Sequence, residues 1–415
     1  MIFEFNKQSV FLMVFLIHLA VYSILSFKRY ADKRNPSDFL LALLLLLGCL
    51  YACPWMLGFA GWYDNQPYRD ILFYVPFQQL FFIGPIGLLY VLYLLNPGFK
   101  IKPTFFYHFL PGIFYLSYSI VCFVADKFIY HSYVMMDDIQ DPDFDNWYQY
   151  LGLISIAGYF FTAYRYYINY RKMVLNFLSN ADALSFTWIR NFFVAVLAFI
   201  ISWLSINFYS VITGGSYTAS WWYFLIFSLL FYYIAITGYS NNTASRLYIK
   251  NWTLHRTPDI VVLTEGAQKM LNSYTPVQAI EEEWEEEKQT ATEPATINNN
   301  AAEAELLEKV ALLINEQQLY ADPGLSLTDL SVATKIGLHV LSRLINTQSG
   351  QNFNDYINNF RVNAIIEKMK AGDHHKTTLI GLAYDCGFNS KTTFQRSFKK
   401  HTGTTPSAYI KTHNL

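Results

Sequence analysis

LIGLAYDCGFNSKTTFQRSFKKHTGTTPSAY, which spans residues 379–409, decides how the C-terminal part of this chain folds. Three apolar residues recur at helical spacing in its first half, namely Ile380, Ala383 and Tyr384. Gly387 then supplies a turn, because glycine tolerates the positive φ of a tight corner. A second helix keeps Phe394 and Phe398 on one side and basic and amide side chains on the other. This pattern is typical of a helix-turn-helix, whose second helix enters the major groove of DNA; a helical hairpin with a solvated basic face is the alternative.

The composition of the whole chain indicates a membrane protein. Of its 415 residues, 53% are hydrophobic and 18% are aromatic, but only 15% are charged, whereas globular domains carry about 25% charged residues. The four cysteines are too few and too scattered for a disulfide framework or a zinc site. No cluster of metal-binding side chains and no nucleophile beside a base is evident in the sequence. We therefore expect no enzyme activity, no catalytic residue, no metal and no cofactor.

Seven apolar segments fill the first 240 residues, and each is close to the ~20 residues that a helix needs to cross the hydrocarbon core. They are Val10–Phe27, Phe39–Gly58, Ile71–Leu95, Phe109–Ala125, Trp147–Tyr167, Asn191–Thr213 and Trp221–Gly238. Tyr and Trp crowd their ends, as expected at headgroup depth. The sequence therefore predicts an all-α chain that begins with a seven-transmembrane-helix sensor domain over residues 1–239.

The distribution of basic residues predicts the orientation of these spans. If the N-terminus lies outside, the inward loops hold ten Lys or Arg residues and the outward segments hold three, Lys7, Arg69 and Lys127. Basic side chains are retained on the cytoplasmic side of a membrane. Seven spans then place the C-terminus in the cytoplasm. We therefore predict a multi-pass protein of the bacterial inner membrane whose C-terminal domain faces the DNA.

Polar residues inside the predicted spans are costly to expose to lipid. Four such residues stand out: His18, Gln78, Gln79 and Asn207. They are candidates for lining a ligand pocket between the helices. Interhelical hydrogen bonds that hold the bundle together are the alternative.

The longest predicted outer loop, Asp126–Asn146, carries six aspartates. The spacing Asp141-x-Asp143-x-Asp145 is similar to the start of a calcium loop, but the glycine and the closing glutamate of an EF-hand are missing. We therefore expect a solvated acidic loop.

Residues 240–302 are predicted to connect the membrane domain to the C-terminal domain. Arg246, Lys250 and Arg256 are placed to meet the anionic inner leaflet. The run EEEWEEE at Glu281–Glu287 and the polar stretch after it are too poor in apolar residues to fold alone. We expect a flexible tether, with cleavage within Gln289–Asn300 as a variant that releases the C-terminal domain.

Residues 303–415 are predicted to form a helical domain with two helix-turn-helix units. After an amphipathic helix at Ala304–Gln318, the first unit pairs a helix from Leu327 to Lys335 with a helix at His339–Asn346. A helix at Phe353–Lys370, about 27 Å long, leads to the second unit. This length is close to the ~34 Å repeat of B-DNA, so both units could enter successive major grooves. From residue 324 onward eleven Lys and Arg, Arg361 among them, face five acidic residues, a net charge of +6 that attracts phosphates.

Two segments, LSRLINTQSGQNFNDYINNFRV and IGLAYDCGFNSKTTFQRSFKKHTGTTPSAY, resemble the two halves of the AraC-type DNA-binding domain, particularly its membrane-anchored branch. The similarity covers about Ser326–Tyr409. It is carried by Gly387-Phe388, Phe394, Phe398-Lys399-Lys400, Gly403 and Thr405-Pro406. The resemblance implies a transcription regulator in which the helices His339–Asn346 and Lys391–His401 read the major groove and the N-terminal region acts as a sensor.

The chain departs from the family at two positions. Gly337 stands where the family usually has a serine cap, and Ile410 replaces an arginine that commonly follows the final tyrosine. Among the exposed residues, Gln395, His339 and Lys391 are expected near base edges, because amide and basic groups bond adenine and guanine. The remaining predicted DNA-binding residues, several of them phosphate anchors, are Val340, Ser342, Arg343, Asn346, Thr392, Arg396, Lys399 and Lys400.

Taken together, the sequence predicts a membrane-bound, sequence-specific transcription regulator that couples a signal sensed at the membrane domain to promoter binding. A membrane receptor or transporter whose cytoplasmic tail acts through protein contacts is the alternative. The predicted partners are double-stranded DNA, the lipid bilayer, a signal ligand or partner protein of unknown identity, and a second copy of the chain.

Overall fold

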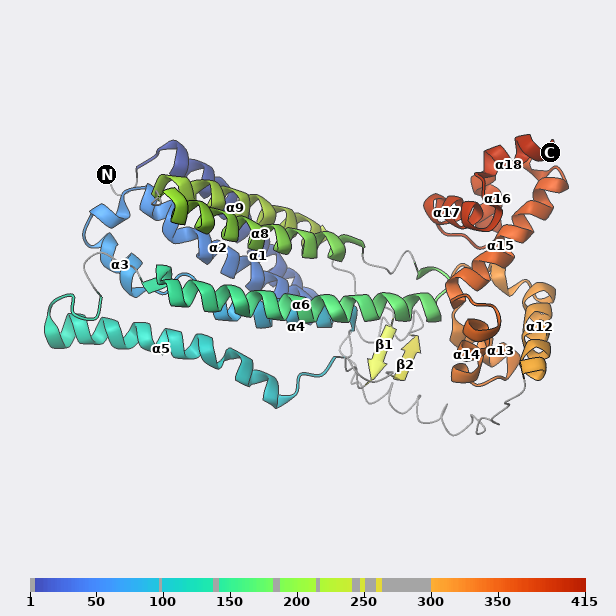
Figure 1. The fold of residues 1–415 in the computed structure, drawn as a ribbon, viewed down its shortest axis with the longest axis horizontal. Coiled ribbons are helices and arrows are strands. Elements are labelled where there is room, and N and C mark those ends of the chain that lie inside the picture. Colours follow the sequence, from blue (N-terminus) through green and yellow to red (C-terminus); the bar gives the residue numbers. More distant parts are fainter. Residues whose placement is uncertain are drawn as a thin grey trace.

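The helices of the N-terminal region lie side by side along the long axis of the molecule, and the C-terminal helices form a separate domain at one end (Figure 1). The computed structural model describes residues 4–96, 99–136, 142–181, 187–213, 217–240, 247–250, 259–262 and 300–415. The end of the bundle that holds the start of α6 (Asn146–Phe177) lies away from the C-terminal domain and is called the distal end below.

The first two helices form an antiparallel pair. α1 (Lys7–Lys33) starts with a capping box in which Asn6 and Ser9 bond each other's backbone N–H groups. α2 (Pro36–Phe59) starts at a proline, which suits the first helical position because it lacks an N–H donor. Arg29 and the buried Asp38 form an ion pair 2.5 Å long where the helices meet. Both predicted spans are therefore helical over slightly longer ranges than the sequence indicated.

The third predicted span, Ile71–Leu95, is not one helix. It is divided into α3 (Tyr68–Tyr74) and α4 (Leu80–Leu95), with a non-helical segment at residues 75–79. Pro76 lies in this segment; it lacks an N–H and disfavours helix at the residue before it. α4 packs between α2 and α6 and is buried along most of its length. Its 16 residues extend about 24 Å, which is short of the ~30 Å hydrocarbon core.

The predicted acidic loop is only partly solvated. α5 (Leu110–Val124), flanked by η2 (Pro103–Phe109) and η3 (Ala125–Tyr130), leads into it, and η4 (Pro142–Phe144) ends it. Asp126 is buried and accepts hydrogen bonds from the N–H groups of residues 134, 135 and 136. Asp143 is buried as well. The expectation of a solvated acidic loop is therefore wrong for these two residues, because backbone and tyrosine donors replace water; residues 137–141 lie outside the described residues.

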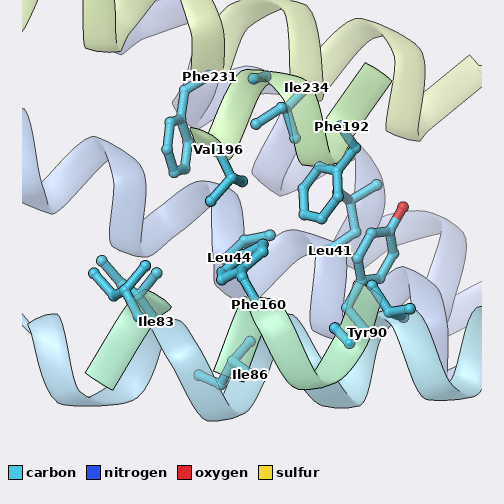
Figure 2. Close-up of a cluster of buried hydrophobic side chains, with 14 of the residues drawn as sticks. Leu41, Leu44, Ile83, Ile86, Tyr90, Phe160, Phe192, Val196, Phe231 and Ile234 are labelled. Carbon is cyan, nitrogen blue, oxygen red and sulfur yellow. The ribbon is translucent and has the colours of Figure 1, made fainter. Parts of the chain in front are cut away.

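The long helix α6 (Asn146–Phe177) has 32 residues and extends about 48 Å. The helices that follow are α8 (Thr187–Thr213) and α9 (Tyr217–Ser240). Side chains from α2, α4, α6, α8 and α9 meet in one apolar core, as Figure 2 shows for Leu44, Ile83, Phe160, Val196 and Ile234.

The structure corrects the number of membrane spans. Within the part of the chain that the structure describes, five helices are long and apolar enough to cross a membrane: Lys7–Lys33, Pro36–Phe59, Pro103–Tyr130, Trp188–Thr213 and Ser220–Ser240. The predicted number of seven is therefore wrong by this criterion. α4 is too short, and the predicted span at Trp147–Tyr167 is rich in tyrosine and contains Gln149 and Arg165, which lower its hydropathy.

The described part of the chain is helical, as predicted, and it contains one short hairpin besides. β1 (Leu247–Lys250) pairs antiparallel with β2 (Asp259–Val262), with Leu247 opposite Val262. The predicted acidic tether and its cleavage window up to residue 299 lie outside the described residues.

The C-terminal domain contains the helices that the sequence predicted, which are α12 (Asn300–Glu316), α13 (Leu327–Thr334), α14 (Leu338–Gln348), α15 (Phe353–Lys370), α16 (Leu379–Asp385) and α17 (Lys391–Thr402). It also contains three helices that the sequence did not indicate: η5 (Leu319–Ala321), η6 (Asp373–His375) and α18 (Pro406–His413). α15 joins two apolar cores, because Ile357 belongs to the core of the first unit and Ile365 to that of the second. The predicted bounds of this connecting helix are confirmed.

Candidate nucleic-acid interface

The turn of the second helix-turn-helix, between α16 and α17, requires glycine for two reasons. Gly387 has a φ of +89°, and a Cβ atom placed on it would lie 2.3 Å from the carbonyl oxygen of Tyr320. The Phe388 N–H donates to the Ala383 carbonyl across the turn, at 2.9 Å. The predicted glycine turn is therefore confirmed. The predicted apolar stripe is wrong at Tyr384, which is 50% exposed, while Leu382 is buried.

α17 presents one apolar and one polar face, as predicted. The Ser390 side chain caps the helix by accepting a hydrogen bond from the Thr393 N–H, at 3.1 Å. Phe394 and Phe398 are buried in the core of the second unit. The polar face borders a groove of about 790 Å³ that also reaches the starts of α16 and α18. Five predicted DNA-binding residues line this groove: Lys391, Thr392, Gln395, Arg396 and Lys399.

Lys400 lies apart from these five residues. Its Nζ atom is 2.7 Å from the Asp355 Oδ2 atom of α15. The neighbouring His401 is within hydrogen-bond distance of Asn359 and Asn363, also on α15. Lys400 therefore helps to seat α17 on α15 and does not line the groove.

The turn of the first unit, between α13 and α14, is built differently from that of the second. Ser326 and Asp329 form a capping box at the start of α13. The helix ends at Lys335, whose φ is +57°, a conformation that glycine or asparagine usually supplies. Gly337 is the N-cap of α14 and has a φ of −55° with no side-chain cap. The first recognition helix therefore starts without the hydrogen bond that a serine at this position would give.

α14 is partly covered by α12. The Glu303 carboxylate of α12 lies 3.4 Å from Arg343 Nη2 and accepts a hydrogen bond from Gln348 Nε2 at 3.0 Å. His339, Arg343 and Asn346 are exposed, whereas Val340 and Ser342 are half-buried. An acidic side chain therefore stands beside the basic residue that this helix would offer to a phosphate.

Arg361 is buried, although the sequence analysis counted it among the basic residues that attract phosphates. Burial lowers the pKa of its guanidinium group to about 10, an effect that Asp322 opposes, so the group is a cation at neutral pH. It donates to five oxygens: Tyr320 O, Asp322 O, Asn358 Oδ1, Ser179 O and Ser179 Oγ. Arg361 therefore acts inside the protein and is not available to DNA. Ile410 likewise packs against the core of the second unit, so the position departs from the family by gaining an apolar contact.

The four polar residues predicted for the membrane domain do not form one site. Gln78 and Asn207 line the same pocket, of about 160 Å³, at the distal end of the bundle. Gln79 is buried and bonds the carbonyl of Pro76. His18 is exposed on α1, with its Nδ1 atom 2.7 Å from the Val14 carbonyl oxygen. The sequence did not predict three further residues that line the pocket, Gln149, Trp203 and Tyr223. Residues of these types are common at helix ends or in apolar cores, so nothing marked them as a site.

Comparison with known proteins supports the helix-turn-helix assignment. Residues 330–412 match the protein family described as "Helix-turn-helix domain", which is of the AraC type. No curated protein and no solved structure gives a significant match to the chain. The match covers α14 to α18 and most of α13, and it suggests a DNA-binding transcription regulator.

Proposed function

We propose that this chain is a membrane-bound, sequence-specific transcription regulator that transmits a signal from its N-terminal helices to its DNA-binding domain. The observation that carries the proposal is a direct contact between the segment after α6 and the helix-turn-helix domain. Figure 1 shows α6 running along the bundle to this domain.

The contact is made by backbone and buried polar groups. Leu178 forms an antiparallel bridge with Ser326, and the Ser179 N–H donates to the Leu325 carbonyl at 3.1 Å. The Asn354 amide donates to the Ser179 carbonyl at 2.8 Å. Leu178, Ser179 and Asn354 are all buried. Because buried polar groups are costly to leave without partners, this contact holds the end of α6 in one position on the domain.

The same contact reaches both helix-turn-helix units. Ser326 caps α13 of the first unit. Arg361 binds Ser179 and also lies 5.8 Å from the ring centroid of Phe388, in the turn of the second unit. A displacement of α6 would therefore change the position of both units at once. A signal shifts such an equilibrium by as much as it binds one arrangement better than the other.

The membrane location rests on the five apolar helices and on Lys28, Arg29, Lys33 and Arg34, which gather where the first of these helices leads to the second. We propose that the N-terminus lies outside the bacterial inner membrane, that the C-terminal domain is cytoplasmic, and that two copies pair on a promoter. The chain has no enzymatic role in this proposal.

DNA binding is tested with the full-length protein in lipid nanodiscs. Fluorescence anisotropy with a labelled duplex should show binding that weakens steeply as salt rises, because released counterions drive it. Absence of salt-sensitive binding to any duplex would favour the receptor or transporter alternative. The location is tested by following a C-terminal tag through an alkaline membrane wash; a tag that appears in the soluble fraction would contradict membrane attachment.

A further inference from the structure

The pocket at the distal end of the bundle is assembled from several elements that are far apart in the sequence. Tyr51 comes from α2, Gln149 from α6, Asn207 from α8 and Tyr223 from α9. Gln78 comes from the non-helical segment between α3 and α4. Non-helical backbone among apolar helices is tolerated where it is buried in protein or lines a cavity. The break at residues 75–79 therefore has a structural use here.

The polar groups of the pocket are held in place before any ligand arrives. Gln78 is fully buried; its Nε2 atom donates to the Tyr51 carbonyl at 3.1 Å, and its Oε1 atom accepts from Gln149 Nε2 at 2.6 Å. Its backbone N–H donates to the Asp143 carboxylate at 2.9 Å. The hydroxyls of Tyr51 and Tyr223 are 2.7 Å apart. Such fixed groups lower the entropy that a ligand loses on binding.

The lining defines the chemistry of the ligand. Among the described residues that line the pocket, none is Lys, Arg, His, Asp or Glu; amides and hydroxyls alternate with aromatic rings such as Trp55 and Trp203. Amides and hydroxyls both donate and accept hydrogen bonds, whereas an ion would enter without a countercharge, which is costly. The volume of about 160 Å³ is similar to the ~150 Å³ of an engineered apolar cavity that binds benzene, so it suits a molecule of about one ring.

We propose that this pocket binds a small uncharged molecule with a flat apolar body and amide or hydroxyl groups. Binding of this molecule does not depend on the proposed function; only its role as the signal rests on that function. Gln149 connects the pocket to the regulator, because it lies near the start of α6 and the other end of α6 leads to the DNA-binding domain. One rigid helix therefore joins the ligand site to the contact at Ser179.

The test measures binding directly on the full-length protein in nanodiscs, without DNA. The probes are neutral amides and alcohols with one ring, chosen to match the pocket volume of about 160 Å³, with benzamide paired against its charged isostere benzoate. Saturation-transfer NMR up to about 10 mM suits such weak ligands. We expect neutral members of the set to bind the wild type at least about tenfold more tightly than their charged isosteres.

Two variants fill the pocket without removing the bonds of Gln78. Asn207→Leu and Ser210→Leu each add apolar volume to its lining, and each should weaken binding about tenfold or more. His18→Leu, at an exposed position outside the pocket, is the matched control and should bind like the wild type. The proposal is overturned if benzoate binds as well as benzamide, if both filled variants retain binding, or if no neutral probe binds. None of these outcomes affects the DNA-binding test. The ligand proposal can therefore be wrong while the proposed function holds, and the reverse.

Discussion

Arg361, in the middle of α15, donates two hydrogen bonds to Ser179, the second residue after α6: one to its carbonyl oxygen at 3.1 Å and one to its hydroxyl at 2.9 Å. A buried cation without a carboxylate partner is expensive unless its N–H groups are satisfied. Here five oxygens from three parts of the chain accept hydrogen bonds from the guanidinium group. The end of α6 is therefore part of the environment that the DNA-binding domain needs for its own core.

Asn354→Ala should weaken this contact selectively. The change removes the amide that donates to the Leu178 and Ser179 carbonyls. The Ser179 carbonyl keeps Arg361 as a donor, so the expected cost is that of the two lost hydrogen bonds, about 0.5–1.5 kcal/mol each. Hydrogen exchange should therefore become faster at residues 178–181, while α15 stays protected. Asn359→Ala, one turn further along α15 and bonded to Gln351 instead, is the control. Equal exchange at residues 178–181 in both variants would argue against a structural role for Asn354.

Gly387→Ala should destabilise the second helix-turn-helix strongly. The new Cβ atom would meet the Tyr320 carbonyl oxygen at 2.3 Å and the residue would keep a φ of +89°. The left-handed conformation alone costs about 1–2 kcal/mol for a non-glycine residue, and the backbone clash adds to it. Gly403→Ala is the matched control, since its φ is +78° but its Cβ atom would meet open space.

Hydrogen exchange of the α16 and α17 amides measures the free energy of unfolding of the second unit. This free energy should fall by about 1–2 kcal/mol in Gly403→Ala and by clearly more in Gly387→Ala. A similar loss in both would mean that the approach to Tyr320 relaxes freely and that φ alone selects glycine.

Lys399→Ala should weaken DNA binding for every sequence. Lys399 lines the groove beside α17, and removing one phosphate contact should reduce the slope of log K against log salt by about 1. Lys400→Ala should change the slope less, because Lys400 is paired with Asp355. Lys309→Ala, on α12 and paired with Glu305, removes the same charge away from the groove. Identical slopes for wild type and Lys399→Ala would remove Lys399 from the interface.

Gln395→Ala should relax sequence preference instead of uniformly reducing affinity. Gln395 is exposed on the groove face of α17, and a glutamine that bonds adenine in a bidentate way contributes about 1–3 kcal/mol of discrimination. Selection from a random duplex library should return a consensus that is degenerate at one position. An unchanged consensus would place Gln395 on the phosphate backbone or away from DNA.

The sequence predicts the C-terminal domain better than the N-terminal region, for a physical reason. In the C-terminal domain each boundary has a local cause: Ser390 caps α17 and Gly387 turns the chain, so short-range chemistry locates the helices. In the N-terminal region hydrophobicity alone marks a helix, and it does not distinguish α4, which is buried among other helices, from a helix that faces lipid.

The contacts between residues far apart in the chain could not be predicted from the sequence. Arg361 has the charge of a surface residue although it lies four residues from both Ile357 and Ile365 on the buried face of α15. The oxygens that satisfy it there, such as those of Ser179 after α6, come from distant parts of the chain. Gln78 and Asn207 were identified because polar residues are rare in apolar spans, but nothing in the sequence separates them from Gln79 and His18. Which polar residues share a pocket depends on tertiary packing.

The stability of the distal end should depend on pH through Asp143. Burial raises the pKa of its carboxyl group to about 6, although hydrogen bonds from Tyr115 and from the backbone of Gln78 favour the ionised form. The folded protein then binds a proton at a higher pH than the unfolded chain, so this group makes folding more favourable as pH falls from about 7 through 6 towards 4. Over this pH range the free energy of unfolding should increase by about 1–3 kcal/mol through Asp143.

Asp143→Asn isolates this effect, because the amide keeps an acceptor for Tyr115 and does not titrate. Between pH 7.5 and 5, the thermal midpoint of the wild type in nanodiscs should rise relative to that of Asp143→Asn. Asp145→Asn, at a neighbouring residue whose carboxylate accepts a hydrogen bond from Trp147 Nε1, is the comparison and should follow the wild type. If the wild type and Asp143→Asn show the same pH profile, the hydrogen bonds to Asp143 offset its burial, and the carboxylate is ionised throughout this range.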